Sequence, residues 1–150
     1  MMCDIRIFEV TEAKKEYVDA VNRLLVQLSS SPTFVTLEYL VEIIDSRSSH
    51  LFFAESEDGV VGMLTVGQYL APTGRKMWIE DVVVDEAARG RSVGRMLVEY
   101  AISFVKEIGA GTLMLTSRPS RVAANNLYRS CGFEPKETNM YRMPIVSAKD

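Results

Sequence analysis

The stretch between Val82 and Leu97 combines arginine and glycine in a way that an ordinary connector does not require. It reads VVVDEAARGRSVGRML, with Arg89, Arg91 and Arg95 placed around two glycines. A β-branched run precedes these residues and an apolar helical pattern follows, which predicts a strand, a glycine-bearing loop and a helix start. Such a loop directs backbone N–H groups to one point, where the helix dipole adds partial positive charge. The pattern therefore predicts an anion site, with phosphate as the expected anion.

Two common phosphate-binding loops do not fit this stretch. It has no Gly-Lys-Ser/Thr sequence, which excludes a P-loop, and GRSVG lacks the glycine spacing of a dinucleotide-binding fold. The alternative without a ligand is a solvated basic loop. Because cations at a helix N-terminus oppose the macrodipole unless an anion offsets them, anion binding is the favoured interpretation.

Length and composition limit the classes of protein to consider. The chain has 150 residues, is 47% hydrophobic and 25% charged, and carries a formal net charge of −3. These values fit one soluble domain spanning residues 1–150 around one core. Because the chain is acidic overall, no broad basic surface for nucleic acid is expected, and the arginines of the loop form a local cluster.

The sequence also gives no indication of a membrane span, a signal peptide, a disulfide framework or a metal site. No run of about eighteen apolar residues occurs, so no membrane span is expected. The start MMCDIRIFEV lacks a basic segment followed by an apolar stretch, so we expect no signal peptide and a cytoplasmic location. Cys3 and Cys131 lie far apart and His50 is the sole histidine, so neither a disulfide framework nor a metal site is expected. At an apolar helix end, Cys131 is interpreted as hydrophobic packing rather than as a nucleophile.

Hydrophobic periodicity predicts the elements that must position the loop. Thr11 is the expected cap of the first helix, Gly59 supplies a hairpin turn, and Gly109 ends the helix that follows the loop. The resulting order is β-α-α-β-β-β-α-β-α-β, a mixed α/β sheet. In chain order, the expected elements are a strand at 3–10, helices at 11–28 and 36–45, strands at 51–56, 60–70 and 76–84, a helix at 92–108, a strand at 112–117, a helix at 121–131, and one or two strands within 133–143.

Two motifs resemble hallmarks of the GNAT superfamily of N-acetyltransferases. RGRSVG is similar to that family's acetyl-coenzyme A pyrophosphate loop, which has Arg or Gln, two residues, Gly, one residue, then Gly or Ala. Arg89 and Gly94 match, whereas Ser92 stands where the first glycine usually lies. NNLYRSCGF resembles the second hallmark, a helix carrying Leu-Tyr and ending in Gly-Phe. WIEDVVV is similar to the corresponding strand of glucosamine-phosphate and related small-amine acetyltransferases.

The resemblance implies a fold, an activity and partners. The expected fold is of the α+β type within the α/β class, with a mixed, mostly antiparallel sheet flanked by about four helices. The expected activity is direct transfer of acetyl from acetyl-CoA, as cosubstrate, to a primary amine of a small molecule in a ternary complex. Amino sugars, polyamines, aminoglycosides, amino acids and protein N-termini all stay open as acceptors. Dimers are common in the family, so a homodimer is a further expectation, whereas neither nucleic acid nor membrane is expected as a partner.

Three alternatives stay open beside this activity. A coenzyme A-binding module without catalysis would serve as a sensor or partner domain, although an intact Tyr128 and an acidic Glu80 disfavour it. Acetylation of a protein N-terminus or lysine would use the same chemistry on a larger acceptor. A nucleic-acid-binding protein would use the arginine loop, and steeply salt-dependent binding would identify it.

The resemblance also assigns catalytic residues. Tyr128 matches the family tyrosine and is the expected proton donor to the departing thiolate, although without the motifs simple packing would be favoured. Glu80 is the candidate base and Asp81 the second candidate, because a carboxylate in an apolar strand is costly unless it has a task or a partner. Adjacent strand residues point to opposite faces, so only one of the two carboxylates is expected to reach the acceptor. The alternative to a catalytic role is that the carboxylate charge is stabilised by a neighbouring helix end.

Coenzyme contacts follow from the same motifs. The valine run is expected to bind the pantetheine arm through its backbone, and Gly90 to Arg95 to hold the pyrophosphate. The family's asparagine seven positions before the tyrosine is here Arg121, which leaves that contact to Asn125. The complete expected set is Val82, Val83, Val84, Arg89, Gly90, Arg91, Ser92, Val93, Gly94, Arg95 and Asn125.

Overall fold

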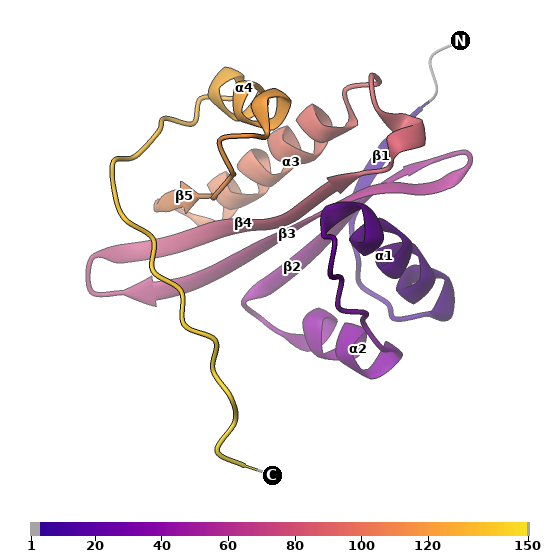
Figure 1. Ribbon diagram of the computed structural model, residues 1–150, viewed down its shortest axis with the longest axis horizontal. Coiled ribbons are helices and arrows are strands. Elements are labelled where there is room, and N and C mark those ends of the chain that lie inside the picture. Colours follow the sequence, from indigo (N-terminus) through magenta and orange to yellow (C-terminus); the bar gives the residue numbers. More distant parts are fainter. Residues whose placement is uncertain (1–3, 150) are drawn as a thin grey trace.

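A single five-stranded sheet organises the computed structural model, which describes residues 4–149 (Figure 1). The strands lie in the order β1-β2-β3-β4-β5, with antiparallel pairing from β1 to β4 and parallel pairing between β4 and β5. This arrangement confirms the expected mixed, mostly antiparallel sheet. The strands are β1 (Arg6–Glu9), β2 (Ser49–Ser56), β3 (Gly59–Ala71), β4 (Gly74–Val84) and β5 (Thr112–Met114).

Helices pack on both faces of the sheet (Figure 1). The helices α1 and α2 cover one face, and α3 covers the other with α4 beside it. A short 3₁₀ helix, η1 (Glu86–Ala88), connects β4 to α3. Among residues 4–149, no helix combines the length and apolar character that crossing a bilayer requires. The α-helices are α1 (Lys15–Leu28), α2 (Leu37–Asp45), α3 (Val93–Ile108) and α4 (Val122–Ser130).

Strand alternation divides the core into two clusters. In β2, Phe52 belongs to the cluster on the α3 face and Phe53 to the cluster on the α1–α2 face, because successive side chains point to opposite sides. Leu97 of α3 fills the first cluster, whereas Leu24 of α1 and Leu40 of α2 fill the second. The sheet is thus packed on both sides, which fixes β4 between the two core clusters.

Helix ends agree with the sequence in two cases and differ in one. The helix expected at 36–45 begins at Leu37, where the Thr36 side chain caps it by accepting a hydrogen bond from the Tyr39 backbone N–H at 3.1 Å. Gly109 ends α3 with a φ of 142°, as expected. The first helix was expected from Thr11 but begins at Lys15. The Lys14 ammonium lies 3.1 Å from the Glu12 carboxylate, so local ion pairing occupies the segment that was expected to form the first turn.

The last expected strand is absent from the described chain. Residues 133–149 form neither strand nor helix and follow an extended path across the sheet (Figure 1). The strand prediction within 133–143 is therefore wrong, and the order ends at α4. Pro135 and Pro144, which lack N–H donors, lie near its two ends, and the polar run 136–139 interrupts the apolar alternation that a strand requires.

Candidate active site

The candidate site lies where β4 and β5 part. Only Lys76 to Trp78 of β4 pair with β5, whereas β4 continues to Val84. A β-carbon added at Gly94, in the first turn of α3, would lie 3.7 Å from a methyl carbon of Val84 and 3.4 Å from one of Leu127 in α4. The end of β4, the start of α3 and the middle of α4 therefore meet at one place. Gly94 leaves space there that any larger residue would occupy.

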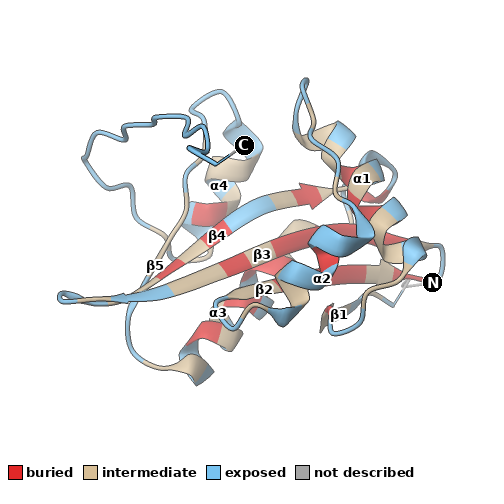
Figure 2. Ribbon diagram, turned by 90° about the horizontal axis from the view of Figure 1, so that it is seen from below, coloured by how far each residue is buried: buried red, intermediate tan, exposed pale blue. Residues whose placement is uncertain are grey.

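A β-bulge interrupts β4 at this divergence. Thr65 of β3 pairs with Glu80 and Met63 pairs with Val83, so two steps on β3 correspond to three on β4. Asp81 accommodates the extra residue with a φ of 51°, a left-handed conformation that aspartate tolerates better than most residues. Figure 2 shows the resulting exposed stretch in the middle of β4, between buried segments. The bulge frees backbone groups of β4 from the ladder next to the candidate base.

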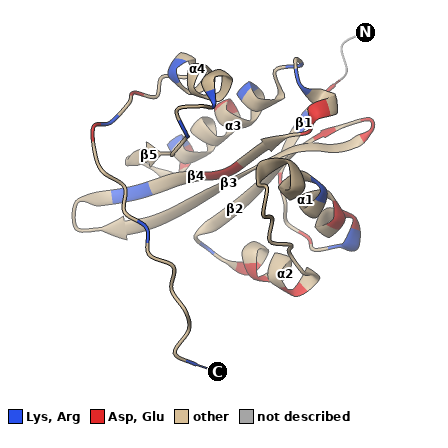
Figure 3. Ribbon diagram, viewed as in Figure 1, with Lys and Arg blue, Asp and Glu red and all other residues tan. Residues whose placement is uncertain are grey.

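Glu80 opens onto the α1–α2 face beside this bulge. Partial burial raises the pKa of the Glu80 carboxyl above its ordinary value, and the negative charge of Asp81 raises it further. Within the described chain, no basic side chain forms an ion pair with Glu80. The two carboxylates appear as the acidic stretch in the middle of β4 in Figure 3. The alternative of a charge satisfied by a helix end therefore finds no support, and a raised pKa suits a general base.

The loop between β4 and α3 has an irregular backbone of the kind that can surround an anion. Gly90 and Ser92 both have left-handed backbones, with φ values of 83° and 61°, on either side of Arg91. Alternation of this kind turns successive N–H groups toward a common concavity. Ser92 is the residue before α3, and its side chain makes no capping hydrogen bond. Arg89 is exposed and pairs with Glu86 at 3.9 Å.

Helix α1 anchors the start of this loop, a role that sequence reasoning missed. The Arg23 guanidinium pairs with the Asp85 carboxylate and also donates to the Val60 carbonyl at 2.7 Å. The Glu86 backbone N–H donates to the Gln27 side chain at 2.9 Å. These contacts join residues far apart in the sequence, so no local pattern could have identified them. They hold the loop against α1 and the β2–β3 hairpin.

Two expected coenzyme ligands have structural partners of their own. The Arg95 guanidinium donates to the Ser130 hydroxyl and to the Glu99 carboxylate, the latter at 3.4 Å, and so ties α3 to the end of α4. The Asn125 amide donates to the carbonyls of Arg118 and Arg121 at 2.9 and 2.8 Å. Arg95 thus extends along α3 toward α4, while Asn125 holds the entry to α4. Coenzyme contacts of both side chains stay predictions.

Tyr128 projects from α4 into the core cluster on the α3 face. It is 7% exposed and shares that cluster with the partly buried Val82 and Val84 of β4. Burial raises the pKa of the Tyr128 hydroxyl, and the charge of Arg121 opposes this only in part. Its ring packs edge-on against Phe133, with 6.2 Å between ring centroids. The hydroxyl therefore stays protonated at neutral pH, and Tyr128 belongs to the cluster on the side of β4 opposite Glu80.

A groove opens beside Glu80 on the α1–α2 face. Its volume is about 560 Å³, within the range of small-molecule sites. Strand alternation places Trp78 and Glu80 of β4 on this face, and Gly67 and Tyr69 of β3 lie beside them by antiparallel register. The groove is lined by Ser48, Ser49, Gly67, Gln68, Tyr69, Trp78, Glu80 and Met140.

Comparison with known proteins decides the family. The sequence model described as "Acetyltransferase (GNAT) family" matches residues 18–133, most of the chain. The chain belongs to the GNAT acetyltransferase family. The expected family and the expected enzyme class, an acyltransferase of the N-acetyltransferase type, are thereby confirmed.

Relatives of this GNAT chain include small-amine acetyltransferases. A protein named probable glucosamine 6-phosphate N-acetyltransferase 2, from Oryza sativa subsp. japonica, is 32% identical over 147 residues, which cover 91% of this chain and 84% of the relative. Aminoglycoside N(6')-acetyltransferase type 1 from Stenotrophomonas maltophilia is 30% identical over 119 residues, covering 73% and 76% of the two chains.

A solved structure confirms the fold of this GNAT chain. An aminoglycoside acetyltransferase from an uncultured soil metagenomic sample, crystallised with sisomicin, superposes with a TM-score of 0.81 at 18% identity. The match covers 95% of this chain and 97% of that chain. At this identity the likeness extends to the fold alone.

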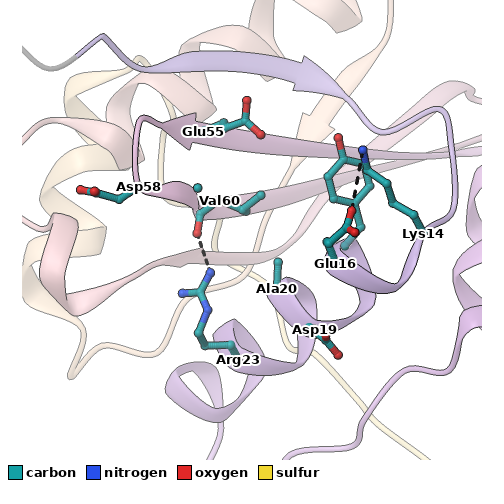
Figure 4. A pocket seen from close by; sticks show the side chains of 10 residues that line it. Lys14, Glu16, Asp19, Ala20, Arg23, Glu55, Asp58 and Val60 are labelled. Carbon is teal, nitrogen blue, oxygen red and sulfur yellow. Dashed lines mark hydrogen bonds and ion pairs between the residues drawn. The ribbon is translucent and has the colours of Figure 1, made fainter.

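A second hollow in this GNAT chain contains none of the expected site residues. It lies between α1 and the β2–β3 hairpin and has a volume of about 500 Å³ (Figure 4). Arg23 and Lys14 each face a carboxylate or a carbonyl, with Lys14 4.0 Å from Glu16. Lys14 and Arg23 thus have partners, whereas the four carboxylates of Glu16, Asp19, Glu55 and Asp58 outnumber the two basic groups of the lining.

Proposed function

We propose that this GNAT chain transfers acetyl from acetyl-CoA directly to a primary amine of a small molecule, in a ternary complex. The observation that carries the proposal is the bulge in β4. It lies where β4 leaves β5, with Glu80 on one face of the sheet and the Tyr128 hydroxyl in the cluster on the other. An amine arriving from the α1–α2 face would therefore meet a base on its own side and an acid beyond the acetyl group.

The chain offers a continuous surface for the coenzyme. The unpaired edge of Val82 to Val84 would bind the pantetheine arm as an added strand binds an open sheet edge. The N–H groups around Gly90 and Ser92, with the start of α3, would hold the pyrophosphate. The space at Gly94 supports this placement, because it lies between β4 and α4 beside both surfaces. Acetyl-CoA supplies an activated thioester, and the chain's own residues orient the reactants and transfer the protons.

Proton transfers are assigned to two side chains. Glu80 removes a proton from the acceptor ammonium, for which its raised pKa is suited. Backbone N–H groups freed by the bulge at Asp81 donate to the oxygen on which negative charge develops. Tyr128 donates its hydroxyl proton to the departing sulfur. Because acetyl passes straight to the amine, no covalent intermediate with the protein forms.

Acceptor class and assembly are part of the proposal. The named relatives act on an amino sugar phosphate and on aminoglycosides, which supports a small-molecule acceptor. We also propose a homodimer, because the segment 134–149 leaves Tyr141, Ile145 and Val146 more than four-fifths exposed. Apolar exposure on this scale is typical of a surface that binds another protein, and a second copy of the chain is the proposed occupant.

A thiol-release assay tests the activity. Purified chain is mixed with acetyl-CoA and a panel of amines, and free thiol is followed with a colorimetric reagent. We expect release that depends on the amine, with a matching acetylated product by mass spectrometry. If acetyl-CoA binds but no amine in the panel promotes release, the module without catalysis becomes the better account.

A further inference from the structure

The groove beside Glu80 has an open floor because one position on β3 lacks a side chain. Ser49, Gly67 and Trp78 lie in one cross-strand row, with Gly67 in the middle. A β-carbon added at Gly67 would meet only the Ser48 carbonyl oxygen, at 4.0 Å. Gly67 does not have a positive φ, so the backbone does not require glycine there. The space above this residue is therefore the feature that glycine provides.

The groove walls combine aromatic rings with a single charge. Trp78 and Tyr69 lie in neighbouring strands on the same face, and Glu80 is the one ionisable carboxyl among the described lining residues. No lysine or arginine belongs to the described lining, and Lys76, two residues before Trp78 on the same face, lies outside it. Aromatic faces attract organic cations, whereas a phosphate group needs basic partners that bind it with charge-assisted hydrogen bonds.

We propose that the groove selects cationic amines that carry no phosphate, with the ligand lying over Gly67 against Trp78 and its reactive nitrogen directed to Glu80. The inference rests on the proposed function for the identity of the reacting site. The substrate class proposed here differs from that of the rice relative, whose name specifies a phosphorylated amino sugar. The substrate class is thus an unphosphorylated amino sugar or polyamine.

Trp78 provides a direct probe, because it is the only tryptophan in the chain. The intact chain is titrated with glucosamine, spermidine and glucosamine 6-phosphate while tryptophan fluorescence is recorded, with and without saturating coenzyme A. We expect glucosamine or spermidine to change the fluorescence and to bind at least about tenfold more tightly than glucosamine 6-phosphate, the size of one charge-assisted contact.

A pair of valine variants locates the binding site. Gly67→Val places a side chain on the floor, where its β-carbon would come no closer than 4.0 Å to the Ser48 carbonyl oxygen. It should abolish the fluorescence response, while circular dichroism and the melting temperature show a folded chain. Ala71→Val, at the far end of the same strand, is the matched control and should respond like the wild type. Equal or tighter binding of glucosamine 6-phosphate, an unchanged response in folded Gly67→Val, or no response to any probe would overturn the proposal.

The two proposals fail in distinguishable ways. Fluorescence reports occupancy of the groove without turnover, whereas thiol release reports acetyl transfer. Binding of unphosphorylated amines without thiol release would refute the activity and leave the groove specificity intact. Faster acetylation of the phosphorylated sugar would uphold the activity and refute the specificity.

Discussion

At the scale of single residues, the environment that suits Glu80 to act as a base also disfavours its ionised form in the folded chain. Its carboxyl lies in an apolar strand next to Asp81, and both partial burial and that neighbour raise its pKa. A group held in this way is a better proton acceptor near neutral pH than an ordinary carboxylate. The same environment penalises its ionised form in the folded chain.

For catalysis, we expect Glu80→Gln to lower turnover by about 10²-fold or more near neutral pH. The remaining reaction would depend on amine that is already deprotonated in solution, so raising the pH should recover part of the loss. The measurement is a pH–rate profile of both proteins on one acceptor. If Asp81→Asn alters the profile and Glu80→Gln does not, the roles of the two carboxylates are exchanged.

Although Glu80→Gln should lower turnover, it should raise the stability of the folded chain at neutral pH. Because the pKa of Glu80 is above its ordinary 4.5 only in the folded chain, that state binds more protons, and stability falls as pH rises through this window. Glu80→Gln removes this penalty. Its melting temperature should exceed the wild-type value at neutral pH and converge with it in acid, as thermal melts across pH would show.

Tyr128→Phe separates packing from proton donation. The ring and its contact with Phe133 persist, so the melting temperature and coenzyme affinity should change little. Loss of the acid should lower kcat and kcat/KM together by about 10²- to 10⁴-fold. The measurement is steady-state kinetics with chemistry confirmed as rate-limiting. Wild-type turnover in this variant would show that Tyr128 only packs.

At the scale of elements, the site depends on how β4, α3 and α4 approach one another at Gly94. Alanine there would make ordinary contacts with Val84 and Leu127 and should raise helix stability by up to about 1 kcal/mol. Valine would fill the space assigned to the coenzyme. We therefore expect calorimetry to show coenzyme A affinity lost in Gly94→Val and lowered less in Gly94→Ala. Wild-type affinity in folded Gly94→Val would refute the placement.

A second prediction at this scale concerns Gly111, which precedes β5. A β-carbon there would lie 2.7 Å from the Arg75 carbonyl oxygen, a backbone atom that cannot move without shifting β4. We expect Gly111→Ala to destabilise the fold by about 1–3 kcal/mol and to weaken coenzyme binding by disturbing the divergence of β4 and β5. Gly67→Ala, which adds the same atom in open space, is the control. Equal denaturation midpoints for the two variants would contradict this account.

Local patterns predicted most elements but not how they meet. The second helix, predicted at 36–45, and Gly109 as a helix end are local features, and both were predicted to within one residue. The bulge at Asp81 depends on the register with β3, and the direction of Arg95 depends on Ser130 of another helix. Trp78 and Gly67 could have been placed beside Glu80 by counting alternate residues along the two strands, provided that the register was known.

At the scale of the whole molecule, the sheet separates the two proposed proton transfers. The base opens on the α1–α2 face and the acid lies in the cluster on the α3 face, so acceptor and coenzyme can enter from different sides. This separation requires the sheet to be held firmly between its two cores. The segment after α4 reaches the acceptor face, where Met140 lines the groove. Assembly through this segment would therefore act on acceptor binding as well.

The segment 134–149 yields the prediction that tests assembly. It exposes Tyr141, Ile145 and Val146 by 88%, 82% and 90%, and β5 is an edge strand in the described sheet. Exposed apolar side chains and an open strand edge each favour pairing with another chain. We expect the full chain to be a dimer by light scattering, and removal of residues 134–150 to give a folded monomer with a weaker acceptor response at Trp78. The variant Tyr141→Ser with Ile145→Ser, which keeps the segment's length, should also shift the equilibrium toward monomer. A monomeric full chain at micromolar concentration, or a dimer that survives both changes, would contradict the role given to this segment.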